Sequence, residues 1–86
     1  MDDSPQFKLF IKPGCPWCVE VVDYLRQRGH RFFIVNVLAD ADGFEEMRRL
    51  SGQAKTPTMQ AGEDGPVLAD FGVDELVPFL DEHGLN

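Results

Sequence analysis

Apolar and polar residues alternate along this 86-residue chain in blocks that predict both strands and helices. Residues 7–11 form a short apolar run, and the proline and glycine that follow it are typical of the end of a strand. Residues 32–38 are apolar almost without alternation, which predicts a strand covered on both faces. Residues 58–61 and 66–69 flank a short stretch of glycine and acidic residues, which predicts a hairpin.

Three further segments have the pattern of helices. The first begins near Pro16, because proline suits the first turn of a helix, and it stops at Gly29. Its apolar face is formed by residues at helical spacing: Cys18, Val21, Val22 and Leu25. The second helix covers residues 43–50, and three of its side chains point inward: Phe44, Met47 and Leu50. The last helix has Asp74 as its N-cap, which places Pro78 in the first turn.

The order of these segments predicts an α/β fold with the sequence β-α-β-α-β-β-α. A strand, a helix and a second strand in this order imply a parallel pair joined by a right-handed crossover. The hairpin then adds two antiparallel strands, which gives a four-stranded mixed sheet flanked by three helices. Because no repeat or linker interrupts the pattern, we expect one domain over residues 1–86. We also expect the protein to be a monomer.

The charge balance narrows the classes of partner. Fifteen acidic and eight basic residues give a net charge of −7, which disfavours nucleic acid and anionic membranes. Residues 1–5 have neither a positive stretch nor an apolar run, so we expect no signal peptide. Two cysteines are too few for a secreted scaffold held by disulfides. We therefore expect a cytoplasmic protein that binds neither nucleic acid nor membrane.

The two cysteines, Cys15 and Cys18, enclose Pro16 and Trp17 at the start of the first helix. Two thiols at this spacing close into a disulfide and open again, which is the layout of a dithiol redox centre. Cys18 belongs to the buried face of the helix, whereas Cys15 precedes the helix and is expected to be exposed. Cys15 is therefore predicted to be the nucleophile, and Cys18 the thiol that resolves the mixed disulfide.

The position of Cys15 also predicts its reactivity. A thiolate attacks disulfides, and a free cysteine with a pKa near 8.5 is little ionised at neutral pH. The unpaired amides and the positive end of a helix dipole favour the anion of Cys15. Lys12, three residues earlier, adds a positive charge.

With these residues, the chain resembles the glutaredoxin branch of the thioredoxin superfamily over nearly its whole length. The matching segments are residues 11–18, Thr56-Pro57 and residues 71–76. The resemblance implies a thioredoxin fold and a cis peptide bond before Pro57, beside the cysteines. It also implies that the backbone of Thr56 faces a bound peptide-like thiol, as an added strand does.

The same resemblance implies glutathione as a co-substrate and no tightly bound cofactor. Lys12 would meet the glycine carboxylate of glutathione, while Val73 and Asp74, at the start of the last helix, would hold its γ-glutamyl end. The full set of predicted glutathione- and substrate-binding residues is Lys12, Pro16, Trp17, Thr56, Pro57, Val73 and Asp74. The substrates would be protein disulfides and glutathione mixed disulfides.

Structural alternatives stay open for three of these residues. Asp74 could act only as an N-cap, and Lys12 could be an ordinary solvated lysine. Trp17 could pack at the rim of the core.

Departures from the family pattern leave the electron donor open. Lys55 stands where a threonine is usual, and Ala69 and Asp70 replace a glycine pair. Residues 70–74 resemble those of glutaredoxin-like redoxins that serve ribonucleotide reductase and are reduced by thioredoxin reductase.

A metal-binding function is a further alternative. A second CxxC pair is absent from the sequence, which disfavours a zinc site within one chain. An iron–sulfur cluster shared by two chains and ligated by glutathione occurs among glutaredoxins, and Pro16 disfavours it by stiffening the helix start.

Overall fold

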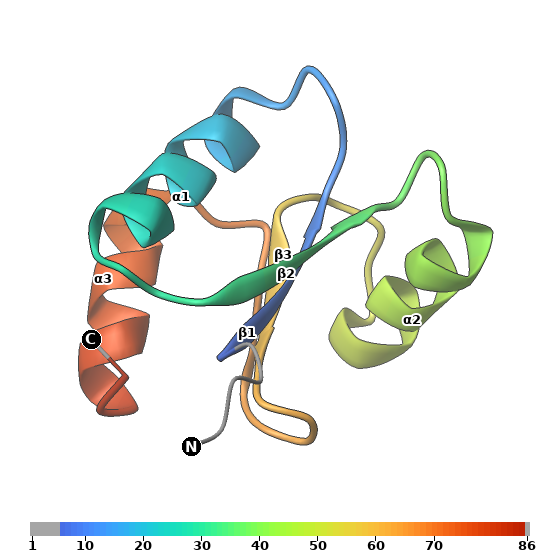
Figure 1. The fold of residues 1–86 in the computed structure, drawn as a ribbon. Coiled ribbons are helices and arrows are strands. Elements are labelled where there is room, and N and C mark those ends of the chain that lie inside the picture. The colour runs from blue at the N-terminus through green and yellow to red at the C-terminus, as the bar shows by residue number, and fades with distance from the viewer. Residues whose placement is uncertain (1–5, 86) are drawn as a thin grey trace.

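Four strands form one mixed sheet in the order β2-β1-β3-β4 (Figure 1). The computed structural model describes residues 6–85. The strands are β1 (Phe7–Ile11), β2 (Phe32–Asn36), β3 (Thr58–Ala61) and β4 (Val67–Ala69). Strand β1 is central, parallel to β2 and antiparallel to β3, and β4 pairs antiparallel with β3. The expectation about a signal peptide concerns residues 1–5, which lie outside the described residues.

Three helices cover the two faces of this sheet. They are α1 (Pro16–Gln27), α2 (Ala41–Ser51) and α3 (Val73–Glu82). Helices α1 and α3 lie side by side on one face, and α2 lies on the other (Figure 1). The predicted order β-α-β-α-β-β-α is confirmed. Within residues 6–85, no helix combines the length and the apolar character needed to cross a membrane.

The larger core lies between the sheet and the helices α1 and α3. Its fully buried members come from four elements: Phe7, Leu9, Val21, Leu25, Met59, Leu76 and Leu80. Each large apolar side chain removed from water in this way contributes about 1.5–3 kcal/mol. The helical spacing predicted for α1 is confirmed at Cys18, Val21 and Leu25, which are buried, while Val22 is half-buried. This packing fixes the axis of α1 and therefore the position of its first turn.

A smaller core joins α2 to the other face of the sheet. Met47 is fully buried against Phe10 and Val35, and Phe44 and Leu50 pack around them, as predicted. The helix begins at Ala41 rather than at residue 43, because the side chain of Asp40 accepts a hydrogen bond from the Gly43 amide (3.0 Å) and caps the N-terminus. The helix ends at Ser51, one residue later than the predicted range, and is capped by Gly52 in the left-handed conformation (φ 71°).

The prediction that residues 32–38 form a strand covered on both faces is wrong. Strand β2 lies at the edge of the sheet, where Phe33 is 56% exposed and Ile34 is 37% exposed. The strand ends at Asn36, because the Asn36 carbonyl accepts the amides of Ala39 and Asp40 and the chain turns there. An apolar run does not determine whether a strand is central or at an edge, since that depends on the order of the other strands.

The start of α3 also differs from the prediction. Gly72, not Asp74, is the N-cap, and its amide donates to the Glu75 carboxylate (2.9 Å). Asp74 is exposed in the first turn, and Pro78 lies in the second turn rather than the first. Strand β4 likewise begins at Val67, one residue later than predicted.

The packing of α2 is tested by the substitution Gly43→Ala. A Cβ at Gly43 would overlap Cγ1 of Val35, so the side chain of Val35 or the helix has to shift. We expect the free energy of unfolding to fall by about 1–3 kcal/mol. This loss occurs although alanine favours a helix by about 1 kcal/mol relative to glycine. Urea unfolding measures the change, and Gly43→Ala should be better tolerated in a Val35→Ala background. An equal loss in both backgrounds would contradict the packing argument.

Candidate dithiol site

Cys15 occupies the N-cap of helix α1. Gly14, with a φ of +81°, reverses the chain after β1, and Pro16 takes the first helical position. The Cys15 backbone is extended (φ −91°, ψ 110°), and its sulfur accepts the amide of Cys18 at 3.2 Å. The sulfur therefore does what a serine or aspartate oxygen does at other N-caps.

Both cysteines are buried, so the predicted exposure of Cys15 is wrong. Cys15 is 5% exposed and Cys18 is 2% exposed, and both are free thiols. The loop that carries Thr56 lies against Cys15. The Cys15 thiol contacts the Thr56 carbonyl oxygen as a donor, at a distance of 3.9 Å. The two thiols therefore differ little in exposure, and the difference between them is electrostatic.

The pKa values of the two thiols shift in opposite directions. Burial acts to raise the pKa of Cys15. Hydrogen bonding by the side chain and amide of Cys18, the nearby side chain of Thr56 and the charge of Lys12 together outweigh burial, so this pKa is lowered. For Cys18, burial and the neighbouring Cys15 sulfur raise the pKa. When the pair loses one proton, the negative charge is therefore favoured on Cys15 rather than on Cys18.

The peptide bond between Thr56 and Pro57 is cis, in agreement with the expectation from the resemblance. Both residues are buried directly before β3, with Thr56 against the sulfur of Cys15. In this way a segment about forty residues later in the chain completes one wall of the dithiol site.

The side chain of Gln53 anchors the loop before Pro57. Its Nε2 donates to the Ser51 hydroxyl (3.1 Å), the Lys55 carbonyl (3.2 Å) and the Thr58 hydroxyl (3.1 Å), and its Oε1 accepts the Lys55 amide. These bonds connect the end of α2 to the start of β3 and hold Thr56 in place. Sequence reasoning missed this role, because a loop glutamine has no pattern that reveals its partners.

Trp17 is 60% exposed and lies against the start of α3. A Cβ built on Gly72 would be 3.1 Å from the Trp17 ring, so the ring covers the N-cap of that helix. The first turns of α1 and α3 consequently meet at the site, and the amides of such turns have no partner within the helix. Trp17 is thus a surface residue beside the cysteines. The structural alternative given above was that it packs at the rim of the core.

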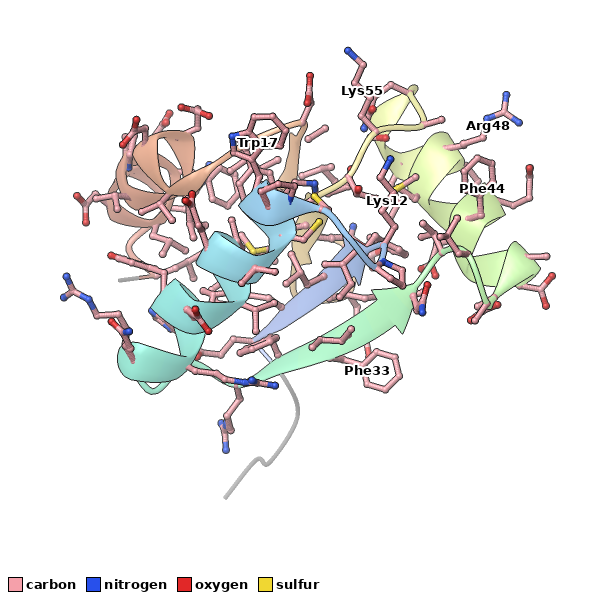
Figure 2. The ribbon with its side chains drawn as sticks, turned by 90° about the horizontal axis from the view of Figure 1, so that it is seen from above. Lys12, Trp17, Phe33, Phe44, Arg48 and Lys55 are labelled. Atoms are coloured by element: carbon pink, nitrogen blue, oxygen red, sulfur yellow. The ribbon has the colours of Figure 1, made fainter. Side chains whose placement is uncertain are left out.

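The remaining predicted residues are less buried than the thiols. Lys12 and Pro16 are exposed, Val73 is half-buried, and Asp74 is exposed in the first turn of α3. Figure 2 shows Lys12 and Lys55 between Trp17 and the α2 residue Arg48, with Phe33 at another part of the surface. Lys55 forms an exposed ion pair with Asp70 (3.7 Å). Among residues 6–85, no group of three His, Cys, Asp or Glu side chains is arranged to hold a metal ion.

Comparison with known proteins agrees with this geometry. The sequence profile of the Glutaredoxin family matches residues 7–64, which include both cysteines and Pro57 but not α3. A glutaredoxin-like 8.6 kDa protein of Clostridium pasteurianum is 33% identical over 75 residues, which cover 87% of this chain and 97% of that protein.

Solved structures show the same fold. A thioredoxin-like protein is 27% identical with a TM-score of 0.75, over 86% of this chain and 99% of that one. A buckwheat glutaredoxin, solved as a complex with glutathione, has a TM-score of 0.71 and 22% identity over 96% of this chain and 74% of that one. The thioredoxin fold expected from the sequence is therefore confirmed.

The electrostatic contribution of Lys12 is tested by the substitution Lys12→Gln. A lowered pKa means that Cys15 reacts as a thiolate above that pKa and loses reactivity as the pH falls through it. Removal of the Lys12 charge moves this loss to higher pH, and we expect alkylation by iodoacetamide at pH 6 to slow about threefold. The difference should shrink in high salt. Arg26→Gln, which removes an equal charge from the last turn of α1, should leave the rate unchanged. Equal effects of the two substitutions would show that net charge alone is responsible.

Proposed function

Because this chain belongs to the glutaredoxin family of thioredoxin-like redox proteins, we propose that it is a glutathione-dependent thiol–disulfide oxidoreductase. Cys15 is the nucleophile and Cys18 the resolving thiol. The observation that supports these roles best is the hydrogen bond from the Cys18 amide to the Cys15 sulfur, which favours negative charge on one sulfur of a buried pair. The substrates are protein disulfides and glutathione mixed disulfides.

In the first step the Cys15 thiolate attacks a substrate disulfide. A bond forms between Cys15 and one substrate sulfur, the substrate S–S bond breaks, and the other sulfur leaves as a thiolate. The Cys18 amide, 3.2 Å from the Cys15 sulfur, holds the attacking atom in place. A stabilised thiolate is also a good leaving group, so the same position serves the reverse step.

Two routes then regenerate the protein. With a glutathione mixed disulfide as substrate, a second glutathione thiolate attacks the adduct, releases Cys15 and leaves as oxidised glutathione. With a protein disulfide, Cys18 loses its proton and attacks the Cys15 adduct, which releases the reduced protein. Two glutathione molecules then reduce the Cys15–Cys18 disulfide and become one molecule of oxidised glutathione.

The charges around the thiols support glutathione as the ligand. Glutathione carries a carboxylate at its glycine end and both an ammonium and a carboxylate at its γ-glutamyl end. Lys12 supplies a cation whose charge acts on Cys15. The first turn of α3, whose N-cap lies against Trp17, carries the amides of Val73 and Asp74 and the Asp74 carboxylate. The buckwheat glutaredoxin of the same fold is solved with glutathione.

We further propose that the protein acts as a cytoplasmic monomer and has no tightly bound cofactor. Glutathione is then a co-substrate that arrives and leaves with each turnover. Glutathione reductase would recycle it.

The choice of electron donor is tested by NADPH oxidation in two arms. One arm contains glutathione, glutathione reductase and a mixed disulfide of glutathione with a small thiol; the other contains thioredoxin reductase alone and a protein disulfide. We expect turnover in the first arm, and the Cys15→Ser variant is the control in both. Turnover only in the second arm would identify a redoxin reduced by thioredoxin reductase, and Lys12 and Asp74 would then not be glutathione ligands. A coloured protein after aerobic purification would instead indicate an iron–sulfur cluster.

The roles of the two cysteines are tested by single serine substitutions. Cys15→Ser should abolish all turnover, because a serine hydroxyl is not ionised at neutral pH and does not attack disulfides. Cys18→Ser should retain reduction of glutathione mixed disulfides and lose the reduction of protein disulfides, which needs the second thiol. Circular dichroism checks that both variants fold. Turnover by Cys15→Ser would contradict the assignment of the nucleophile.

A further inference from the structure

The hydroxyl of Thr56 is a buried polar group without a hydrogen-bond partner. Thr56 is 9% exposed, and its Oγ1 is one of three buried side-chain atoms in residues 6–85 that have no partner, together with Tyr24 Oη and His30 Nε2. Of these three residues, Thr56 is the one whose carbonyl oxygen contacts the Cys15 sulfur. A buried donor without a partner costs about 1–3 kcal/mol, so its place beside two reactive sulfurs needs an explanation.

Ionisation of Cys15 changes the hydrogen bonds that its sulfur can make. As a thiol, Cys15 contacts the Thr56 carbonyl oxygen as a donor, at 3.9 Å. A thiolate has no proton to donate, so the sulfur anion then faces a carbonyl oxygen that can only accept a hydrogen bond. This contact no longer stabilises the sulfur. The Cys18 amide remains as a donor at 3.2 Å. The anion therefore gains from a further donor on the side of Thr56, where the unpartnered hydroxyl lies.

We propose that the Thr56 hydroxyl is a further hydrogen-bond donor that stabilises the sulfur anion of this site, first on Cys15 and then on Cys18. This inference rests on the proposed dithiol mechanism. In the first step the hydroxyl donates to the Cys15 thiolate. Once Cys15 is bonded to the substrate sulfur, it carries no charge, and the hydroxyl is available to the Cys18 thiolate that forms next. One side chain thus serves both steps.

Two observations support a hydroxyl shared by both sulfurs. The Thr56 side chain acts to lower the pKa of Cys15 and also that of Cys18, although burial keeps the latter raised overall. The backbone around Thr56 is also fixed, since Gln53 binds Lys55 on one side and Thr58 on the other. A fixed backbone leaves rotation of the side chain as the way for the hydroxyl to change its partner.

Other charged groups at this end of the molecule remain the same when only the hydroxyl is removed. Lys12 follows β1, Lys55 precedes β3 and pairs with Asp70, and the first turn of α3 carries Asp74 and Glu75. The isosteric substitution Thr56→Val changes none of them and replaces the hydroxyl by a methyl group. Thr56→Ser keeps the hydroxyl and loses the methyl group, so it is the matched control.

Ellman's reagent, an aromatic disulfide that releases a yellow thiolate, measures both steps in one experiment. Attack by the Cys15 thiolate forms a mixed disulfide and releases the first aromatic thiolate. Attack by the Cys18 thiolate forms the Cys15–Cys18 disulfide and releases the second, with the Cys18 proton going to solvent. We expect Thr56→Val to slow each release about tenfold at pH 6, because a hydrogen bond to a charged group is lost. Thr56→Ser should stay within about twofold of the parent protein. At a pH where both thiols are ionised, the difference for Thr56→Val should largely disappear.

The outcomes separate this inference from the proposed function. If the parent protein releases two thiolates in sequence and Thr56→Val matches it at every pH, the hydroxyl has no such role and the dithiol mechanism stands. If Thr56→Val and Thr56→Ser are slowed equally at all pH values, the residue acts through packing and the inference is wrong. If only the first release is slowed, transfer of the hydrogen bond to Cys18 is wrong. If the parent protein reacts at pH 6 no faster than a free thiol, both the mechanism and the inference fail.

Discussion

The hydrogen bond from the Cys18 amide to the Cys15 sulfur is the interaction on which the site depends. The spacing of the two cysteines is the spacing between an N-cap residue and the third residue of a helix, where an N-cap side chain accepts an amide hydrogen. One contact therefore starts the helix, places the two sulfurs side by side and favours negative charge on the first. An oxygen can take the same place, so the helix start does not depend on the redox chemistry.

The register of the sheet brings the rest of the site to this helix start. Phe10 near the end of β1 is opposite Thr58 at the start of β3, and Thr58 is opposite Ala69 at the end of β4. The segments that follow β1, precede β3 and follow β4 therefore meet at one edge of the sheet. Cys15, Thr56 and Gly72 come from these three segments, which explains how residues far apart in the sequence form one site.

Sequence reasoning succeeded where the controlling forces are local. The periodicity of residues 18–25 predicts the buried face of α1, and Pro16 predicts its start. It failed where the answer depends on distant segments. The burial of Cys15 depends on a loop about forty residues later, and the exposure of β2 depends on which strand takes the centre of the sheet. The cap of α3 was misassigned because the Glu75 side chain binds the Gly72 amide, which made glycine sufficient as the N-cap.

The site separates chemistry from partner recognition. Most of the groups that set the charge on sulfur are buried, namely the two cysteines and Thr56, and the exposed Lys12 makes the smallest contribution. The residues proposed to meet a partner are exposed, with Lys12 and Trp17 near the start of α1 and Asp74 on α3. Exposed charges contribute little to stability, so these exposed residues can change without loss of the fold. Because the Lys12 cation follows β1 and the Asp74 carboxylate lies on α3, a ligand with charges of both signs that meets both of them is favoured in one orientation. We therefore expect substitutions of Trp17 and Asp74 to alter which thiol reduces the protein, and substitutions of the buried residues to alter how fast any thiol does so.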